Sequence, residues 1–416
     1  MQRMTINRDG LGHHPPELGS HIPALDGVRG IAIALVMLGH FTIIAPTRAA
    51  ERLIVKGLGT GGVTGVELFF VLSGFLITGI LFDAKGAPFF FRNFYIRRAL
   101  RIFPLYYGFL FVLFVVLPRL TAGPPSPEYR LLLQHQGWYW SYLVNVLIAI
   151  EGTQAAAPLA THHFWSLAVE EQFYLVWPVV VWASDRRTLM VVCAAGVAVA
   201  LLLRVALVAA GVPHIAVAEL TPTRMDALAT GAFIALAARG PSGLAPSLAW
   251  ARRALIPVGA TLLAIFAVPR ANPDGHTLAT VGYTALALFF GATLILAVTA
   301  PPHTLRERAF ANPVLRILGR YSYAIYVFHL PLWSAAVRHG LVSPERLPYV
   351  AGSQMPAQAA LIVALSTLSL AAGWLSWHLY EKHFLRLKVL FPYRTRRAAA
   401  PLEEAMRQEG DAFAAP

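Results

Sequence analysis

Residues 25–44 read LDGVRGIAIALVMLGHFTII, an apolar run as long as a helix needs to cross the hydrocarbon core of a bilayer. Arg29 and His40 lie inside this run, and a separation of eleven residues is about 16 Å along a helix axis. A cation near one face and an imidazole past the midplane are costly in lipid, and polar groups placed in this way mark a functional site by default. The run therefore predicts a membrane helix that carries part of a site.

The rest of the chain has the composition of a helical membrane protein. Of its 416 residues, 57% are hydrophobic and 13% are charged, whereas a soluble domain carries about 25% charged residues. The formal net charge of +13 would suggest nucleic acid in a soluble protein, but basic residues here collect in the loops of one membrane face, so no nucleic-acid partner is expected. Cys193 is the single cysteine, which excludes an intrachain disulfide and a metal cluster built on cysteines.

Apolar stretches near twenty residues recur along the chain and predict an all-α bundle of about ten transmembrane helices with both termini in the cytoplasm. The expected crossings are 26–46, 62–82, 103–120, 164–184, 188–210, 224–238, 253–270, 279–300, 315–336 and 358–380. The apolar stretch 138–150 is short and aromatic at one end, so we expect an interfacial or re-entrant helix there. Counting it as a crossing would destroy the bias that places most of the 34 lysines and arginines on the cytoplasmic side.

This topology divides the chain into three parts. We expect a cytoplasmic N-terminal tail over 1–20, a transmembrane domain over 21–390 and a basic cytoplasmic C-terminal tail over 391–416. The N-terminal tail has no apolar core and is therefore not read as a cleavable signal peptide.

Several expected helices carry ionisable residues at one depth, in the outer half of the membrane. They are His40, Glu67, Glu170, Glu171, Arg224, Asp226 and His329. Each alone has an ordinary explanation, either a snorkelling charge or a histidine bonded to a backbone carbonyl. Unpaired, however, each would cost a few kcal/mol in hydrocarbon. We therefore expect the set to converge and to line a wet cavity.

Basic and aromatic residues alternate in FRNFYIRRALRIFPLYY, residues 91–107, at the cytoplasmic side. One interpretation is topological, with Arg97, Arg98 and Arg101 anchoring a cytoplasmic loop. The other is a phosphate site that these residues form with Arg29, because the guanidinium fork binds phosphate oxygens in a bidentate manner. The second interpretation fits an anionic cofactor that is supplied by the cytoplasm.

These segments closely resemble the membrane acyltransferase-3 family, which includes bacterial O-acyltransferases that act on O-antigen and exopolysaccharide. The matching segments are ALDGVRGIAIALVMLGHF, GVELFFVLSGFLITGIL, FYIRRALRIFPLYY, HFWSLAVEEQFYLVWP, TPTRMDALATG and YSYAIYVFHLPLW. The resemblance implies a ten-helix core in the bacterial inner membrane and transfer of an acyl group, usually acetyl, from acyl-CoA to a hydroxyl of a carbohydrate or related acceptor. Some members carry a C-terminal hydrolase-like domain outside the membrane, and this domain is expected to be absent because the sequence ends at Pro416.

The resemblance also implies roles for individual residues. His40 is the essential histidine, with Arg29, Glu170 and the Arg224/Asp226 pair in support. We expect His40 to act as a general base on the acceptor hydroxyl, with Glu170 fixing its tautomer. A covalent acyl-histidine is the alternative. No metal is expected, because the thioester is already activated.

The remaining expectations concern the ligands. Arg29, Arg97, Arg98 and Arg101 would hold acyl-CoA, while the acceptor would meet Glu67, Ser73, Glu171, Arg224, Asp226 and His329. Ser73 or Arg224 could stabilise the developing charge on the thioester oxygen. The acceptor stays open between lipopolysaccharide O-antigen, exopolysaccharide, a glycolipid and a small metabolite, as do the acyl group and the oligomeric state; the protein otherwise contacts membrane lipid.

A competing hypothesis is a transporter that moves a polar or lipid-linked solute through the same cavity, since buried Glu, His and Arg also suit proton relays. The arginine cluster and the lack of internal repeats favour the enzyme. Two smaller expectations concern single residues. The adjacent His162 and His163 lie at the outer mouth and could touch the acceptor, although adjacent histidines are more often simply solvated, and Arg204 should pair inside the bundle.

Overall fold

The computed structural model describes residues 22–44, 46, 48–120, 124–158, 160–267 and 275–393, which form helices and connecting segments without a β-strand. The expected tail 1–20 and residues 394–416 of the expected C-terminal tail lie outside the described residues. Within the described part, each stretch expected to cross the membrane overlaps with a helix, although the bounds differ, most of all for 103–120, where α4 begins at Phe90. These helices are α1 (Pro23–Phe41), α3 (Gly61–Asp83), α4 (Phe90–Phe111), α9 (Phe164–Ala183), α10 (Arg186–Ala209), α12 (Met225–Ala238), α13 (Ala245–Ala267), α14 (Tyr283–Val298), α16 (Pro313–Arg338) and α17 (Met355–Ser376).

Shorter elements connect and extend these helices. The short α-helices are α2 (Ala49–Gly59), α5 (Leu117–Leu120), α6 (Pro127–Gln134), α7 (Gln136–Trp140), α8 (Val144–Glu151), α11 (His214–Glu219), α15 (Leu305–Phe310) and α18 (Lys382–Arg386). Turns of π-helix extend α4, α14 and α17, at η1 (Val112–Val116), η5 (Leu278–Gly282) and η7 (Trp377–Glu381). Single 3₁₀ turns are η2 (Gln154–Ala156), η3 (Pro222–Arg224), η6 (Pro344–Arg346) and η8 (Leu387–Leu390).

Seven helical segments of the described chain are long and apolar enough to cross a membrane. They are Pro23–Phe41, Ala49–Asp83, Phe90–Leu120, Arg186–Ala209, Ala245–Phe266, Leu278–Val298 and Met355–Leu390. Three of the ten helices at the expected crossings fall outside this set. They are α12, which has only 14 residues, and α9 and α16, which carry many of the polar site residues. The expected all-α, multi-pass architecture is therefore confirmed over these residues. The count of about ten crossings and the cytoplasmic position of both ends stay predictions.

The segment 138–150 does not form one long helix. It is divided between α7 and α8, which are separated by a turn at Ser141–Leu143 in which Tyr142 has a φ of 55°. Helices of 5 and 8 residues are far shorter than the roughly 20 residues that a crossing needs. The turn thus agrees with the expectation that this segment is not a full crossing.

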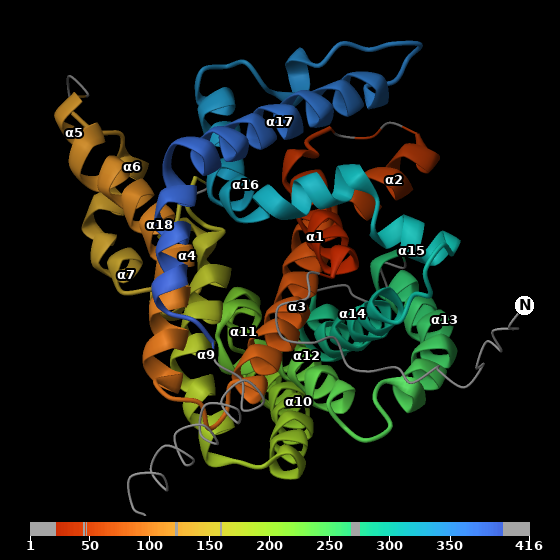
Figure 1. The fold of residues 1–416 in the computed structure, drawn as a ribbon. Coiled ribbons are helices and arrows are strands. Elements are labelled where there is room, and N and C mark those ends of the chain that lie inside the picture. The colour runs from red at the N-terminus through yellow and green to blue at the C-terminus, as the bar shows by residue number, and fades with distance from the viewer. Residues whose placement is uncertain are drawn as a thin grey trace, which may run out of the picture.

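Helices α1 and α3 lie at the centre of the bundle (Figure 1), where α1 packs on α16 and on α3, and α3 packs on α12. Glycines allow these close contacts. A Cβ at Gly30 of α1 would lie 2.0 Å from the carbonyl oxygen of Leu315 in α16, and a Cβ at Gly74 of α3 would lie 1.9 Å from that of Leu228 in α12. Small residues at such crossings are how membrane helices approach closely without a hydrophobic driving force.

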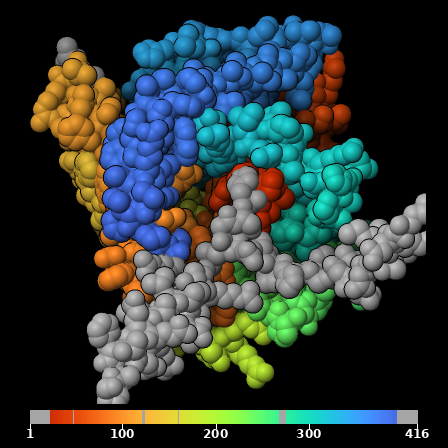
Figure 2. Space-filling view, viewed as in Figure 1, coloured from red at the N-terminus to blue at the C-terminus, as the bar shows by residue number. Residues whose placement is uncertain are grey.

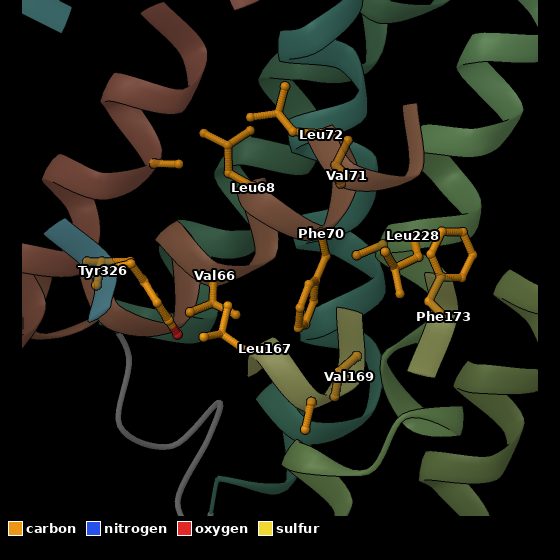
Figure 3. Packing of buried hydrophobic residues seen from close by; sticks show 14 of the residues in the cluster. Val66, Leu68, Phe70, Val71, Leu72, Leu167, Val169, Phe173, Leu228 and Tyr326 are labelled. Carbon is orange, nitrogen blue, oxygen red and sulfur yellow. The ribbon is translucent and has the colours of Figure 1, made fainter. Parts of the chain in front are cut away.

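The other helices surround this centre. Helix α9 packs on α3, while α10 and α14 pack on α12. Helix α17 packs along α16, and the chain then turns through α18 onto α4, so that the C-terminal helices (blue) border one face of the molecule in Figure 2. Figure 3 shows the buried apolar layer between α3, α9 and α12, where Phe70, Val169 and Leu228 gather, with Tyr326 of α16 beside Val66 and Leu167. This packing holds the polar residues described below at fixed depths.

Candidate active site

A cavity of about 140 Å³ lies between α1, α3, α4, α9 and α16, and we call it the central cavity. Its polar lining consists of Arg29, Ser73, Arg98, Arg101, Ser166, Glu170, Tyr174, Ser322, Tyr323 and Tyr326. Arginines lie at one end of it and Tyr326 with Ser166 at the other, so the cavity is charged differently along its length.

The arginine end is built by the first turns of α1 and by α4. Arg98 and Arg101 are three residues apart on α4 and therefore share a face. Arg29 pairs with Asp26 one turn earlier, with Nη1 3.0 Å from Oδ1. The guanidinium of Arg98 lies 5.6 Å from the ring centre of Tyr174, within cation–π range. Three of the four arginines expected to bind the donor are thus brought together.

Arg97 is the exception among the four. Its Nη1 donates to the carbonyl oxygens of Lys388, at 2.8 Å, and Phe391, at 3.0 Å. Its guanidinium also lies 4.6 Å from the ring centre of Tyr393. Being rotated about 100° from Arg98 on the helix, Arg97 holds the C-terminal segment against α4 instead of lining the cavity.

The middle of the central cavity holds a hydroxyl–carboxylate cluster. The hydroxyl of Ser73 donates to Oε1 of Glu170, and its oxygen lies 2.9 Å from the hydroxyl oxygen of Tyr174. Ser166, Glu170 and Tyr174 are spaced four residues apart, which places all three on one face of α9. The sequence contained this signal, but only Glu170 was singled out from it.

Tyr326 connects the cavity to a group of histidines beyond it. Its hydroxyl oxygen lies 2.5 Å from Oγ of Ser166 and 3.0 Å from the carbonyl oxygen of His163. Its own carbonyl oxygen lies 2.7 Å from Nδ1 of His329, one turn further along α16. The side chain of Tyr326 thus ends the cavity while its main chain holds a histidine.

His40 lies against this histidine. Nδ1 of His40 is 3.0 Å from Nε2 of His329, and the two rings are stacked with centres 5.1 Å apart. A carbonyl oxygen can only accept, so Nδ1 of His329 carries the hydrogen and a neutral His329 accepts at Nε2. Nδ1 of His40 is therefore the donor in this pair. The order of hydrogen bonds leaves the lone pair of His40 at Nε2.

This arrangement changes the expected partner of His40. Glu170 was expected to fix the tautomer, but its carboxylate faces Ser73 and Tyr174 within the cavity, whereas His40 is not among the cavity-lining residues of the described chain. His329, expected to meet the acceptor, is fully buried and is the hydrogen-bond partner of His40 instead. The physical reason is depth, because Glu170 lies about one helical turn beyond Ser166 and about two turns beyond His163, the two residues that the Tyr326 hydroxyl contacts.

The charged residues of the sixth expected crossing, which were expected to line the cavity, pair with neighbouring helices instead. Arg224 forms an ion pair with Glu67 of α3, and Asp226 pairs with Arg204 of α10, whose Nη2 lies 2.7 Å from Oδ2. All four side chains are at most 1% exposed, and none is among the lining residues of the central cavity. Buried charges need such partners because desolvation is costly. Glu67, Arg224 and Asp226 therefore join α3, α10 and α12, and the expected pairing of Arg204 inside the bundle is confirmed.

Two further expectations differ in the structure. His163 is only 2% exposed rather than solvated, and Nε2 of His162 lies 3.1 Å from Oε1 of Glu219. Burial raises the pKa of the Glu219 carboxyl, although the facing His162 opposes the shift. Glu171 points away from Glu170, outside the cavity lining, and its Oε1 is buried with no hydrogen-bond partner among the described residues.

Comparison with known proteins agrees with the resemblance seen in the sequence. Residues 22–381 match a family profile described as an acyltransferase domain. The chain belongs to the acyltransferase-3 family. No solved structure matches it.

Its relatives are named as O-acetyltransferases. The peptidoglycan O-acetyltransferase of Listeria monocytogenes is 27% identical over 327 residues, which cover 75% of this chain and 49% of that protein. A provisionally named peptidoglycan O-acetyltransferase of Bacillus subtilis is 33% identical over 172 residues, or 40% of this chain and 24% of that protein. A provisionally named O-acetyltransferase of Staphylococcus aureus is 26% identical over 337 residues, covering 76% and 51%. The chain thus spans about half the length, or less, of these relatives.

Proposed function

We propose that this acyltransferase moves an acetyl group from acyl-CoA, taken up at the arginine end of the central cavity, to a carbohydrate hydroxyl met at the histidine end. In the bacterial inner membrane these ends would face the cytoplasm and the outside. The observation that carries the proposal is the hydrogen-bond order from His40 through His329 to the carbonyl of Tyr326, which leaves a lone pair at Nε2 of His40. A lone pair in this position is what a general base requires.

The proposed step is a direct transfer. Nε2 of His40 takes the proton from the acceptor hydroxyl while the oxygen of that hydroxyl bonds to the thioester carbon. The carbon–sulfur bond then breaks, CoA leaves as a thiolate, and His40 returns the proton to the sulfur. The positive charge held by His40 in between is stabilised through Nδ1, which donates to His329.

The hydroxyls in the cavity suit the developing charge on the thioester oxygen. Arg224 was one expected donor, but its pairing with Glu67 outside the cavity makes it a poor candidate. Ser73 faces the cavity, and the Ser166–Tyr326 hydroxyl pair lies nearer to the histidines. Because the single hydrogen of Ser73 is donated to Glu170, we assign the charge-stabilising role to the Ser166–Tyr326 pair, one of whose hydrogens would turn from the carbonyl of His163 to the thioester oxygen. No resident metal enters this mechanism.

The names of the Listeria and Bacillus relatives make a peptidoglycan sugar the first acceptor to test. The experiment follows a deuterated acetyl group from acetyl-CoA to glycan fragments in membranes that contain the protein, read by mass spectrometry. His40→Gln is expected to reduce the transfer rate by about 10² to 10⁴, the usual contribution of positioned proton transfer. Transfer at the wild-type rate by folded His40→Gln protein would end the assignment of the base.

A further inference from the structure

A second cavity, which we call the basic vestibule, adjoins the central cavity at its arginine end and has a volume of about 490 Å³. Arg29 and Arg101 line both cavities, so the two spaces meet at these side chains. The other lining residues of the vestibule are Asp26, Pro313, Arg316, Ile317, Gly319, Arg320 and Trp377. Four arginines and one aspartate thus surround one space.

The close crossing of α1 and α16 creates this concentration of charge. A Cβ at Gly319 would lie 1.9 Å from the carbonyl oxygen of Asp26, so only a glycine allows the helices to approach here. Arg316 and Arg320 are four residues apart on α16 and share a face. Among the described residues, no carboxylate lies within ion-pair distance, 4.0 Å, of either guanidinium. Within the part of the chain that the structure describes, Arg316 and Arg320 therefore bring positive charge to the vestibule that no carboxylate pairs with.

Trp377 adds an aromatic face to the vestibule. The guanidinium groups of Arg320 and Arg101 lie 5.5 and 5.7 Å from the centre of its ring. An aromatic ring next to two arginines is suited to a planar ring that carries phosphates, because stacking and bidentate phosphate contacts then come from one site. A lipid headgroup offers the phosphate but no planar ring.

We propose that the basic vestibule binds the nucleotide end of acyl-CoA, with Arg316 and Arg320 contacting its phosphates and Trp377 facing the adenine. The thioester arm then passes between Arg29 and Arg101 into the central cavity. This assignment rests on the proposed function, since it names where one end of the donor is held. The proposed donor site thus includes residues of α16 and η7 in addition to the arginines of α4.

The test compares two donors. Acetyl-CoA carries the nucleotide, whereas S-acetylpantetheine carries the same thioester arm without it. Arg316→Gln and Arg320→Gln are each expected to raise KM for acetyl-CoA about tenfold, as expected for the loss of a charge-assisted phosphate contact. The KM for S-acetylpantetheine should change far less. Arg338→Gln, at the opposite end of α16, is the matched control and should alter neither KM.

A binding measurement separates this proposal from the proposed function. Adenosine 3′,5′-bisphosphate should bind the purified wild-type protein in neutral detergent, and should bind at least tenfold more weakly to Arg316→Gln and Arg320→Gln, even if no acyl transfer is found. Three outcomes would overturn the proposal. The first is an equal change in KM for both donors. The second is that the bisphosphate does not bind wild-type protein. The third is that phosphatidylglycerol vesicles, and not the bisphosphate, bind in a way that depends on Arg316 and Arg320.

Discussion

Replacing His329 by leucine tests whether its hydrogen bond fixes the tautomer and orientation of His40. In the native pair, Nδ1 of His40 donates to Nε2 of His329 across 3.0 Å, and this bond becomes charge-assisted once His40 takes up the acceptor proton. A hydrogen bond to a charged group contributes about 1.5–3 kcal/mol. At 1.36 kcal/mol for each tenfold change in rate, His329→Leu should lower kcat by about 10- to 150-fold.

The assay is transfer of deuterated acetyl at saturating donor, so that kcat and KM are obtained separately. Because His329 acts through His40 and does not meet the donor, KM for acetyl-CoA should change little. His329→Gln supplies a carbonyl oxygen that can accept from His40, and it should recover part of the lost rate. Both variants need a thermal unfolding midpoint in detergent near that of the wild type, since the side chain is fully buried.

Two results would refute the reasoning. The first is a folded His329→Leu protein with the wild-type kcat, which would mean that the orientation of His40 does not depend on this hydrogen bond. The second is that the glutamine variant shows the same kcat and the same KM as the leucine variant, with no recovery of the rate. In that case, His329 would fill space and not fix a tautomer.

Other predictions concern stability, access and pH. Arg224→Ala leaves the buried carboxylate of its partner uncompensated, which costs about 3–5 kcal/mol, so its unfolding midpoint in detergent should fall well below that of the wild type; an unchanged midpoint would contradict the buried ion pair. A Cβ at Gly62 would lie 3.2 Å from Nε2 of His40, so Gly62→Val should reduce the rate of acetyl transfer sharply. A Cβ at Gly57 would meet open space, so Gly57→Val should leave the rate unchanged. Equal rates for the two variants would argue against a base at Nε2. Because the folded pKa of the Glu219 carboxyl is raised above its ordinary value of 4.5, its contribution to stability is present below that value and is lost as pH rises through the folded pKa. Glu219→Gln should therefore gain in unfolding midpoint relative to wild type as the pH rises above about 4.5, and a pH-independent difference would exclude this explanation.

The sequence predicted the helices better than the contacts between their side chains. Hydrophobic length located most of the helices, because burying an apolar run in lipid depends little on its neighbours. Partner choice is different. Whether Glu67 meets Arg224, or His40 meets His329, depends on how far each helix is rotated and how closely two helices cross, and a single sequence contains neither quantity.

Helical spacing in the sequence could have revealed two groups of cavity-lining residues that were not predicted. Ser166, Glu170 and Tyr174 share one face of α9, and Arg316 and Arg320 share one face of α16. Both patterns are visible at helical spacing. Assigning them to a cavity, however, required knowing that glycines bring α1 and α16 close enough for those faces to meet.

The same close crossing explains how one bundle could serve a ligand with two unlike ends. Helix α1 carries Arg29 and His40 about 16 Å apart, and α16 carries Arg320 and His329 at matching ends. Since the two helices are held in register by glycine contacts, the arginine level and the histidine level are fixed relative to one another. A donor anchored by its phosphates at the first level would therefore present its reactive group at a set distance along the cavity, toward Tyr326. The hydroxyl of Tyr326 lies at the end of that cavity and its carbonyl holds His329, so a single residue of α16 contacts both the cavity and the histidine pair.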